Sequence, residues 1–333
     1  MILLNPGPVN TSARVREALL EGELCHREPE YAAIQEETRG LLRELFAPDH
    51  EALLLAGSGT AAVEAAISSC VPPRGRLMVL VNGVYGRRMA DIARAYGIEV
   101  VERRGPWNEP IGPEACDCDL VAMVHHETTT GVLNRFREVG VPVLLDAISS
   151  IGAEDLPPAD IIVGTANKCI QGVPGAAFVL AKERHLRHPA RNYYLHLARY
   201  REGIPFTPAV PAVVALREAL LELKEETVAC RGERYRQAAG LLRDGFERMG
   251  LKLYLKPEHR SSSLTTVHLP PLGTARGELE YDLLHDRLKS EGYVIYKGVM
   301  EGVFRVANMG WIPARELRRF LSVLEETICM RSC

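Results

Sequence analysis

One stretch near the middle of the chain ends an apolar strand pattern on a lysine and then turns sharply. Residues 161–163 form a short apolar run suited to a buried strand, and Lys168 follows where that strand is expected to end. The cluster 172–175 holds two glycines and a proline, which neither a helix nor a central strand can continue. Burial disfavours the charged ammonium and leaves a more nucleophilic amine, the form that Schiff-base chemistry requires. The alternative is a lysine whose head simply reaches solvent from a surface loop.

A second ionisable residue ends a neighbouring apolar run. Residues 141–145 have a buried-strand pattern, and Asp146 follows them. The segment between Asp146 and Lys168 is long enough for one connection and one further strand. Parallel strands present their carboxyl ends at one edge of a sheet. We therefore expect the two side chains to face one crevice. An acid for a pyridinium nitrogen and a lysine for a Schiff base are the protein's contribution to pyridoxal phosphate (PLP) chemistry. The alternative is an aspartate that caps a turn, with Lys168 as its salt-bridge partner.

A pattern of strand, glycine turn and helix supplies a candidate phosphate site. The run 51–56 is mostly apolar, Gly57-Ser58-Gly59-Thr60 turns the chain, and residues 61–66 favour a helix. A helix N-terminus offers free backbone N–H groups and a positive dipole end, and the two hydroxyls add donors. The glycine spacing also fits a dinucleotide site, but the next strand ends at Asn82-Gly83 without the acid that would hold a ribose. A site for a phosphate alone therefore fits better than one for NAD.

Composition excludes several classes of partner. The 333 residues are 47% hydrophobic and 25% charged, as in an ordinary globular chain with one large and one smaller domain. A net charge of −3 without a Lys/Arg block argues against a nucleic acid or membrane partner. The eight cysteines are scattered, with Cys116 and Cys118 the only close pair, which favours a reduced, cytoplasmic protein without a metal site. No apolar run reaches membrane length, and the N-terminus lacks the basic region of a signal peptide.

The order of the predicted elements favours an α/β fold with a mainly parallel sheet and a smaller α+β C-terminal domain. The expected divisions are an N-terminal segment, a large domain, connecting helices and a small domain, over residues 1–13, 14–211, 212–250 and 251–333. In the last of these we expect strands over 251–255, 264–269, 293–297 and 304–307, and helices over 278–291 and 314–330. Arg305 falls in the last strand, where an arginine either pairs with an acid or binds an anionic substrate.

His125 and His126 close another buried-strand pattern, 120–124. Adjacent residues on a strand point in opposite directions, so the two imidazoles cannot face one metal ion. We expect a hydrogen-bonding role for one of them.

Four strings in this chain closely resemble the 2-aminoethylphosphonate–pyruvate aminotransferases, a branch of the class V, fold type I family of PLP-dependent enzymes. They are Gly57-Ser-Gly59, Asn82-Gly-Val-Tyr-Gly86, Met123-Val-His-His-Glu-Thr-Thr-Thr-Gly131 and Thr165-Ala-Asn-Lys-Cys-Ile-Gln-Gly-Val-Pro-Gly175. Alanine–glyoxylate and serine–pyruvate aminotransferases are cousins in the same family. The resemblance covers nearly the whole chain and implies a fold type I transferase with a large and a small domain.

The resemblance also implies a role for each matched residue. Lys168 would be the Schiff-base lysine, Asp146 the partner of the pyridinium nitrogen, and Arg305 the contact for the anionic end of the substrate. The other implied cofactor ligands contact the phosphate or the ring of PLP. The resemblance also implies a homodimer with shared active sites, in which one threonine contacts the cofactor of the other subunit. These residues are Ser58, Gly59, Thr60, Tyr85, Thr128, Ile148, Asn167 and Thr207. Tyr85 would stack on the ring, and Thr128 would lie near its phenolic oxygen.

The implied reaction is ping-pong transamination from 2-aminoethylphosphonate to pyruvate, which gives phosphonoacetaldehyde and alanine. Within the family the alternative is an alanine– or serine–glyoxylate (or pyruvate) aminotransferase. A PLP lyase would need a mobile nucleophilic cysteine, and the loop 297–302 has none. The connections at 102–119, 131–146 and 193–206 are shorter than in such relatives and border the expected substrate entrance. We expect them to affect which substrate is accepted more than the type of reaction. Further candidates to bind the substrate's anion are Arg27, Arg87 and Arg201.

Overall fold

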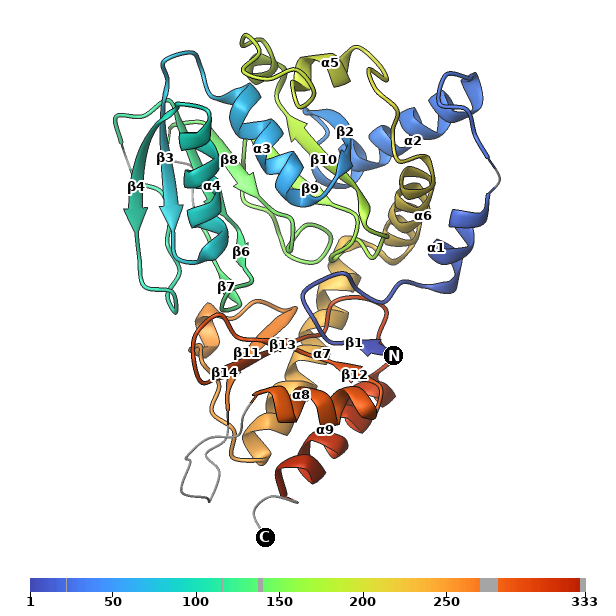
Figure 1. The fold of residues 1–333 in the computed structure, drawn as a ribbon, viewed down its shortest axis with the longest axis vertical. Helices are drawn as coiled ribbons and strands as arrows, with labels where there is room; N and C mark the ends of the chain where they lie inside the picture. The colour runs from blue at the N-terminus through green and yellow to red at the C-terminus, as the bar shows by residue number, and fades with distance from the viewer. Residues whose placement is uncertain (22, 115, 137–139, 270–280, 330–333) are drawn as a thin grey trace.

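A seven-stranded sheet forms the centre of the larger part of the molecule (Figure 1). The computed structural model describes residues 1–21, 23–114, 116–136, 140–269 and 281–329. The strand order is β2-β10-β9-β8-β5-β3-β4, where β10 pairs antiparallel with both neighbours and the other pairs are parallel. The bounds are β2 Glu51–Gly57, β3 Arg76–Val81, β4 Glu99–Arg104, β5 Leu120–Val124, β8 Val143–Asp146, β9 Ile161–Thr165 and β10 Gly175–Ala181. The prediction of an α/β fold with a mainly parallel sheet is confirmed.

Helices cover both faces of this sheet, which explains why its central strands read as continuous apolar runs. On one face, Leu77 and Val79 pack in a core with residues of α3 (Gly59–Cys70) and α4 (Val84–Ala95). On the other face, Leu80 and Phe178 pack with α2 (Pro29–Phe46) and α6 (Val210–Glu226). The two short helices α1 (Ala13–Glu17) and α5 (Leu197–Arg201) lie beside them. Because both faces are covered, a ligand can reach the sheet only at its edges or at the ends of its strands.

A three-stranded sheet, β11-β14-β13, carries the smaller part of the molecule. Its strands are β11 Leu264–His268, β13 Tyr296–Lys297 and β14 Val303–Ala307, and its helices are α7 Val228–Arg248, α8 Tyr281–Ser290 and α9 Ala314–Cys329. Phe246, Phe304 and Phe320 lie in its apolar core. The expected helix over 278–291 is α8, and residues 278–280 lie outside the described residues. The same holds for residue 330 at the end of the helix expected over 314–330.

Two strand predictions in this smaller part are wrong. Residues 251–255 form no strand, since only Leu253 makes an isolated bridge, to Val267. Leu251 and Leu255 are each 5% exposed, so their spacing reflects contacts with the core rather than a ladder, and a 3-10 turn follows at Pro257–His259. The strand expected over 293–297 is divided into β12 (Tyr293–Val294) and β13, which belong to different sheets.

The first ten residues are joined to the smaller part. β1 (Ile2–Leu3) pairs in parallel with β12, and Asn10 bridges to Gly310. The loop between them reaches the larger part, where the carbonyl oxygen of Pro6 accepts a hydrogen bond from Lys168 Nζ. The N-terminal segment therefore lies between the two parts of the molecule.

Cys116 and Cys118 form a disulfide, so the expectation of reduced cysteines is wrong for this pair. Their Cα atoms are 5.5 Å apart, within the range that a disulfide bridges. Of the other six cysteines, residue 333 lies outside the described residues and the rest are free thiols: Cys25, Cys70, Cys169, Cys230 and Cys329. Among the described residues, no helix has the length and apolar character needed to cross a membrane.

Candidate active site

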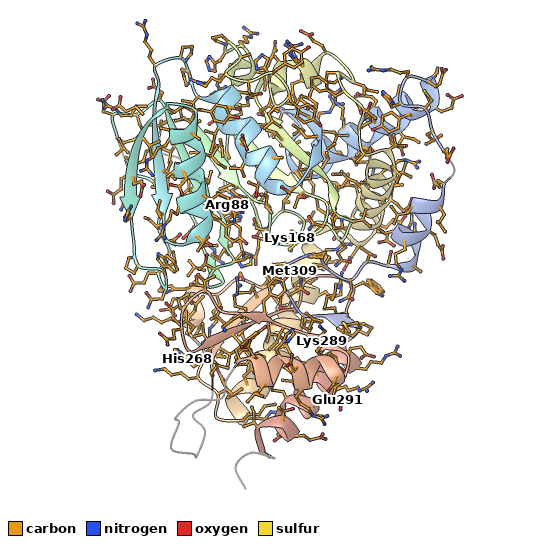
Figure 2. The ribbon with its side chains drawn as sticks, viewed as in Figure 1. Arg88, Lys168, His268, Lys289, Glu291 and Met309 are labelled. Atoms are coloured by element: carbon orange, nitrogen blue, oxygen red, sulfur yellow. A yellow bond between two sulfur atoms is a disulfide. The ribbon has the colours of Figure 1, made fainter. Side chains whose placement is uncertain are left out.

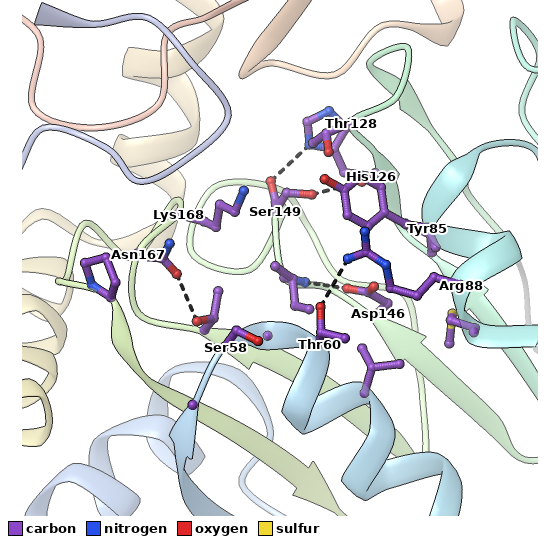
Figure 3. A pocket seen from close by; sticks show the side chains of 18 of the residues that line it. Ser58, Thr60, Tyr85, Arg88, His126, Thr128, Asp146, Ser149, Asn167 and Lys168 are labelled. Carbon is purple, nitrogen blue, oxygen red and sulfur yellow. Dashed lines mark hydrogen bonds between the residues drawn. The ribbon is translucent and has the colours of Figure 1, made fainter. Parts of the chain in front are cut away.

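Asp146 and Lys168 line one cavity of about 360 Å³ at the carboxyl ends of β8 and β9 (Figure 3). The two strands are parallel neighbours, with Asp146 opposite Val163, so their ends open at the same edge of the sheet. Lys168 lies at the junction of the two parts of the molecule (Figure 2). We call this space the cofactor cavity. Seven further residues that the sequence singled out also line it: Ser58, Gly59, Thr60, Tyr85, Thr128, Ile148 and Asn167.

The N-terminus of α3 forms one end of the cofactor cavity. Ser58 is the N-cap residue, with extended backbone and no side-chain cap hydrogen bond, so its hydroxyl is available to a ligand. A Cβ at Gly59 would lie 2.6 Å from Ile148 Cδ1, so a larger residue there would require the Ile148 side chain to move. The first N–H groups of a helix have no intrahelical partner and favour an anion. These features fit a phosphate group.

Asp146 is the buried acid of the cavity. Its side chain is 6% exposed, and its Oδ1 accepts a hydrogen bond from the backbone N–H of Ile148 at 3.0 Å. Burial, with a smaller contribution from the nearby Glu127 carboxylate, raises the pKa of Asp146 to about 7, although the Ile148 N–H, Lys168 and Arg88 act in the opposite direction. A carboxylate held so unfavourably is stabilised by a cation placed next to it. This fits the protonated ring nitrogen of PLP.

Burial acts in the opposite direction on Lys168. It lowers the pKa of the Lys168 amine to about 8, while Cys169 and Asp146 oppose this change and Arg305 adds to it. The loop of residues 6–8 covers the amine, and a Cβ at Gly7 would lie 2.6 Å from Lys168 Cδ. A substantial neutral fraction near pH 8 is what a nucleophilic or proton-accepting amine needs.

Arg88 was missed by the sequence analysis, although it also lines the cavity. Its Nη1 donates to Thr60 Oγ1 at 3.1 Å, and its guanidinium lies 4.9 Å from the ring centre of Tyr85 (Figure 3). Tyr85 and Arg88 are three residues apart on α4, so they share one helix face. This three-residue spacing from Tyr85 is the sequence signal that could have identified Arg88. Arg88 places a positive charge beside the α3 N-terminus.

Glu127 is a second residue that the sequence did not single out. It is fully buried, and its Oε2 accepts from the backbone N–H groups of Tyr85 and Gly86 at 3.2 and 3.3 Å. Its Oε1 accepts from the N–H of Thr129 at 3.0 Å. Burial raises the pKa of Glu127, whereas these hydrogen bonds lower it. Glu127 thus holds the first turn of α4, and with it Tyr85, against the cavity.

The two adjacent histidines face different spaces, as expected of neighbours along a strand. His126 lines the cofactor cavity, where its Nδ1 lies 3.0 Å from the carbonyl oxygen of Ser149 and its buried Nε2 has no hydrogen-bond partner in the described ranges. His125 lines a different cavity, and its Nδ1 lies 2.9 Å from Ser150 Oγ. The expected hydrogen bond therefore exists for both rings. The two imidazole rings point in opposite directions because His126 lies in β6 (His126–Glu127), which pairs antiparallel with β7 (Val132–Leu133).

Arg305 lies next to the cofactor cavity rather than in its wall. Its Nη1 donates to the carbonyl oxygen of Thr128 at 2.8 Å, and its Nε and Nη2 donate to that of Lys297 at 3.1 and 2.8 Å. Burial lowers the pKa of Arg305, while nearby tyrosines and Glu127 raise it. A guanidinium has five N–H donors. The three bonds described leave one donor on each terminal nitrogen, the pair that a carboxylate or phosphonate accepts.

The remaining sequence candidates lie elsewhere on this chain. Thr207 is exposed and does not line the cofactor cavity. Arg27 donates to the carbonyl oxygen of Ile204, and Arg201 pairs with Glu183. Arg87 lies over the ring of Trp107. None of these three arginines is among the residues that line the cavity.

Known proteins resemble the chain over nearly its full length, although no family model matches it. Curated relatives named 2-aminoethylphosphonate–pyruvate transaminase include one from Bacillus cytotoxicus, 33% identical over 98% of each chain. One from Lactiplantibacillus plantarum is 31% identical over 97% of this chain and 96% of the relative.

Solved structures of aminotransferases have the same fold. The aspartate aminotransferase of Thermus thermophilus superposes with a TM-score of 0.89 and 27% identity, over 99% of this chain and 100% of that one. An alanine–glyoxylate aminotransferase from Nostoc sp. has a TM-score of 0.87 and 27% identity, over 98% and 94% of the two chains.

Proposed function

The chain belongs to the 2-aminoethylphosphonate–pyruvate transaminase family, and from this membership we propose that it transfers the amino group of 2-aminoethylphosphonate to pyruvate with PLP as its cofactor. The products are phosphonoacetaldehyde and alanine. The proposal rests on one observation: Asp146, Lys168 and the N-terminus of α3 line the same cavity. Acid, amine and anion site are the three groups that PLP requires of a protein.

The residues of the cofactor cavity divide the work of holding PLP. Lys168 would attach it covalently, Asp146 would face its ring nitrogen, and the α3 N-terminus at Ser58 would bind its phosphate. The other contacts that we propose are Gly59, Thr60, Tyr85, Thr128, Ile148, Asn167 and, from this structure, Arg88. When bound, PLP supplies an electron sink for the pair left behind when a proton leaves the substrate carbon.

Lys168 has two tasks in this proposal. Its amine first binds the cofactor and, once displaced by the substrate amine, accepts the proton from the carbon that bears the nitrogen. Its lowered pKa of about 8 supports the second task, since only the neutral amine can accept a proton. The Pro6 carbonyl oxygen holds the amine by a hydrogen bond in the structure and would limit where the free lysine can move.

Arg305 is the proposed contact for the anionic end of the substrate. Its two remaining donors suit the phosphonate of the donor and the carboxylate of pyruvate, so one guanidinium serves both halves of the reaction. The carbonyl groups of Thr128 and Lys297 hold it in place from the larger and the smaller part.

A panel of amino donors tests the substrate. With pyruvate as the acceptor, kcat/KM is measured for 2-aminoethylphosphonate, serine, alanine, taurine and β-alanine, with a further assay of alanine against glyoxylate. We expect the phosphonate to have the highest value. If serine, or alanine with glyoxylate, clearly exceeds it, the chain is an alanine– or serine–glyoxylate (or pyruvate) aminotransferase and the cofactor chemistry is unchanged.

We further propose a homodimer in which Thr207 contributes to the active site of the other subunit. Thr207 is exposed on this chain, beside an aromatic cluster in which Tyr193 and Tyr194 are 67% and 44% exposed and contact Phe206. Exposed apolar clusters of this kind are typical of interfaces. Sedimentation at the concentration of the activity assay should give a dimer, and a fully active monomer would contradict the proposal.

A cytoplasmic location is also part of the proposal. Cys25, Cys230 and Cys329 are exposed free thiols, which a reducing compartment preserves. Detection of the protein in the cytoplasmic fraction of its source cells tests this location, and its recovery only outside the cytoplasm would overturn it.

A further inference from the structure

A second cavity lies on the other side of the segment 125–126 and has a surplus of positive charge. Its volume is about 640 Å³, and none of its lining residues is shared with the cofactor cavity. Four arginines line it against two carboxylates, and we call it the arginine cavity. Its charged residues are Arg135, Arg236, Arg243, Arg260, Glu154 and Asp155.

The carboxylates of this cavity leave the arginines largely unneutralised. Glu154 Oε1 accepts from both the backbone N–H and the Oγ of Ser262, at 2.7 and 2.6 Å. Arg236 pairs with Glu233, outside the lining. Within the described part of the chain, no ion pair joins Arg135, Arg243 or Arg260 to a carboxylate. Arginines therefore outnumber carboxylates in this space, and three of the four have no ion-pair contact among the described residues.

Arg243 is held firmly in position although it lacks an acidic partner. Its Nε donates to Thr265 Oγ1 at 3.1 Å, and its Nη2 donates to the carbonyl oxygen of Ser261 at 2.5 Å. Burial, together with repulsion from Arg260, lowers the pKa of Arg243 to about 10, although Glu154 and Glu247 act in the opposite direction. Its Nη1 has no hydrogen-bond partner in the described residues. A rigid guanidinium with a free terminal nitrogen is a preformed donor for an oxyanion.

Two further features point to a ligand. Ser261, which also lines the cavity, is 1% exposed, and its Oγ has no hydrogen-bond partner among the described residues. Arg260 donates from its Nε to the carbonyl oxygen of Leu255 at 2.9 Å, and no hydrogen bond joins its two terminal nitrogens to the part of the chain that the structure describes. A buried hydroxyl such as that of Ser261 and a desolvated cation such as Arg243 are costly without partners, and a bound anion would compensate the charge of Arg243.

We propose that the arginine cavity binds a small dianionic oxyanion of the phosphate or phosphonate class. The donors come from both parts of the molecule, since Arg135 follows β7 beside the large sheet, whereas Arg243 lies on α7 and Arg260 precedes β11. A bound dianion thus links the larger part to the smaller one, at a site separate from the substrate contact Arg305. The proposal does not depend on which amine the enzyme accepts.

The test is calorimetric titration of the PLP-loaded full-length protein with inorganic phosphate and, separately, with methylphosphonate, against sodium chloride at equal ionic strength. We expect saturable binding of at least one of the two oxyanions and none of chloride. The double variant Arg135→Gln/Arg260→Gln should weaken this binding by about a hundredfold, because two charge-assisted contacts are lost. Arg315→Gln, which removes an 83% exposed arginine on α9, is the matched control and should bind as the wild type does.

The active-site variant Arg305→Lys separates this site from the catalytic one. Binding that persists in Arg305→Lys and is lost in the double variant supports the proposal. Binding that is lost in Arg305→Lys and kept in the double variant overturns it, as does the absence of saturable binding to the wild type. If the double variant does not fold, Arg135→Gln alone, at an exposed position, should still weaken the binding by about tenfold. A failed donor panel would leave these outcomes unchanged.

Discussion

The cofactor cavity and the arginine cavity differ in how their charges are compensated. In the cofactor cavity, Asp146 and Lys168 are an acid and a base whose charged forms are both disfavoured by burial. In the arginine cavity, charges of one sign dominate, and the arginines remain charged because a guanidinium cannot give up its proton near neutral pH. Adjacent residues, His126 and His125, line one cavity each.

This difference separates two ways of binding. Groups with shifted pKa values can exchange protons with a substrate near neutral pH, which is what an active site needs. Permanent cations cannot, so a cavity made of them can bind an anion but offers little acid–base chemistry. The following variants test this division, from the largest expected effect to the smallest.

Lys168→Ala should lower kcat with 2-aminoethylphosphonate and pyruvate by about a thousandfold or more, because both the attachment point and the proton acceptor are lost. Steady-state rates at saturating PLP measure this. Arg135→Lys in the arginine cavity is the control and should keep the wild-type rate. Near-wild-type turnover by Lys168→Ala would refute the assignment of the catalytic lysine.

Arg305→Lys should lower kcat/KM for 2-aminoethylphosphonate by about a hundredfold. An ammonium provides a point charge but not the paired donors that Arg305 has left after its bonds to Thr128 and Lys297. The same exchange at Arg135 should not change kcat/KM. Equal losses at both positions would mean that the two cavities are not functionally distinct.

Gly7→Ala should lower kcat by about tenfold through strain at the lysine. Gly7 has a φ of +108°, and the added Cβ would lie 2.6 Å from Lys168 Cδ, so the loop or the lysine must move. Gly40→Ala is the matched control, since outside its own helix no described atom lies within 4 Å of its added Cβ. Unchanged kinetics in Gly7→Ala would show that the N-terminal loop does not constrain Lys168.

Asp146→Asn should change the pH dependence of stability in the cofactor-free protein. The pKa of Asp146 is raised to about 7 in the folded state, above the ordinary value of about 4. Between pH 4 and pH 7 the folded state keeps a proton on Asp146 that the unfolded state has lost. The stability present below pH 4 is therefore lost progressively as the pH rises to about 7. Asparagine does not titrate, so the variant should gain about 2–3 kcal/mol on the wild type between pH 5 and 8.

Urea unfolding of both cofactor-free proteins at pH 5 and pH 8 measures this gain. With PLP bound, the gain should disappear, because the ring nitrogen gives the Asp146 carboxylate a cationic partner. A stability difference that is the same at both pH values would contradict the raised pKa of Asp146.

Much of the cofactor cavity could be predicted from the sequence because its residues follow a topological rule. Asp146 and Lys168 come directly after strand patterns, and the ends of adjacent parallel strands must meet. The glycine turn at Gly57–Thr60 follows the same logic, since the helix after it must start at that edge of the sheet. Arg88, on helix α4, and Glu127, in the two-residue strand β6, escaped prediction because charged side chains are usually solvated.

Local pattern alone therefore determined the α/β fold, the buried strands and the acid and amine at their ends. Only the tertiary structure decided the contacts between segments that no regular period connects. These include the hydrogen bond from Lys168 to the Pro6 carbonyl and the hydrogen bond from Arg305 to the Thr128 carbonyl. They also include the gathering of arginines that follow β7, lie on α7 and precede β11. The physical reason is that hydrogen bonds and strand periodicity act over a few residues, whereas such contacts depend on how whole layers pack.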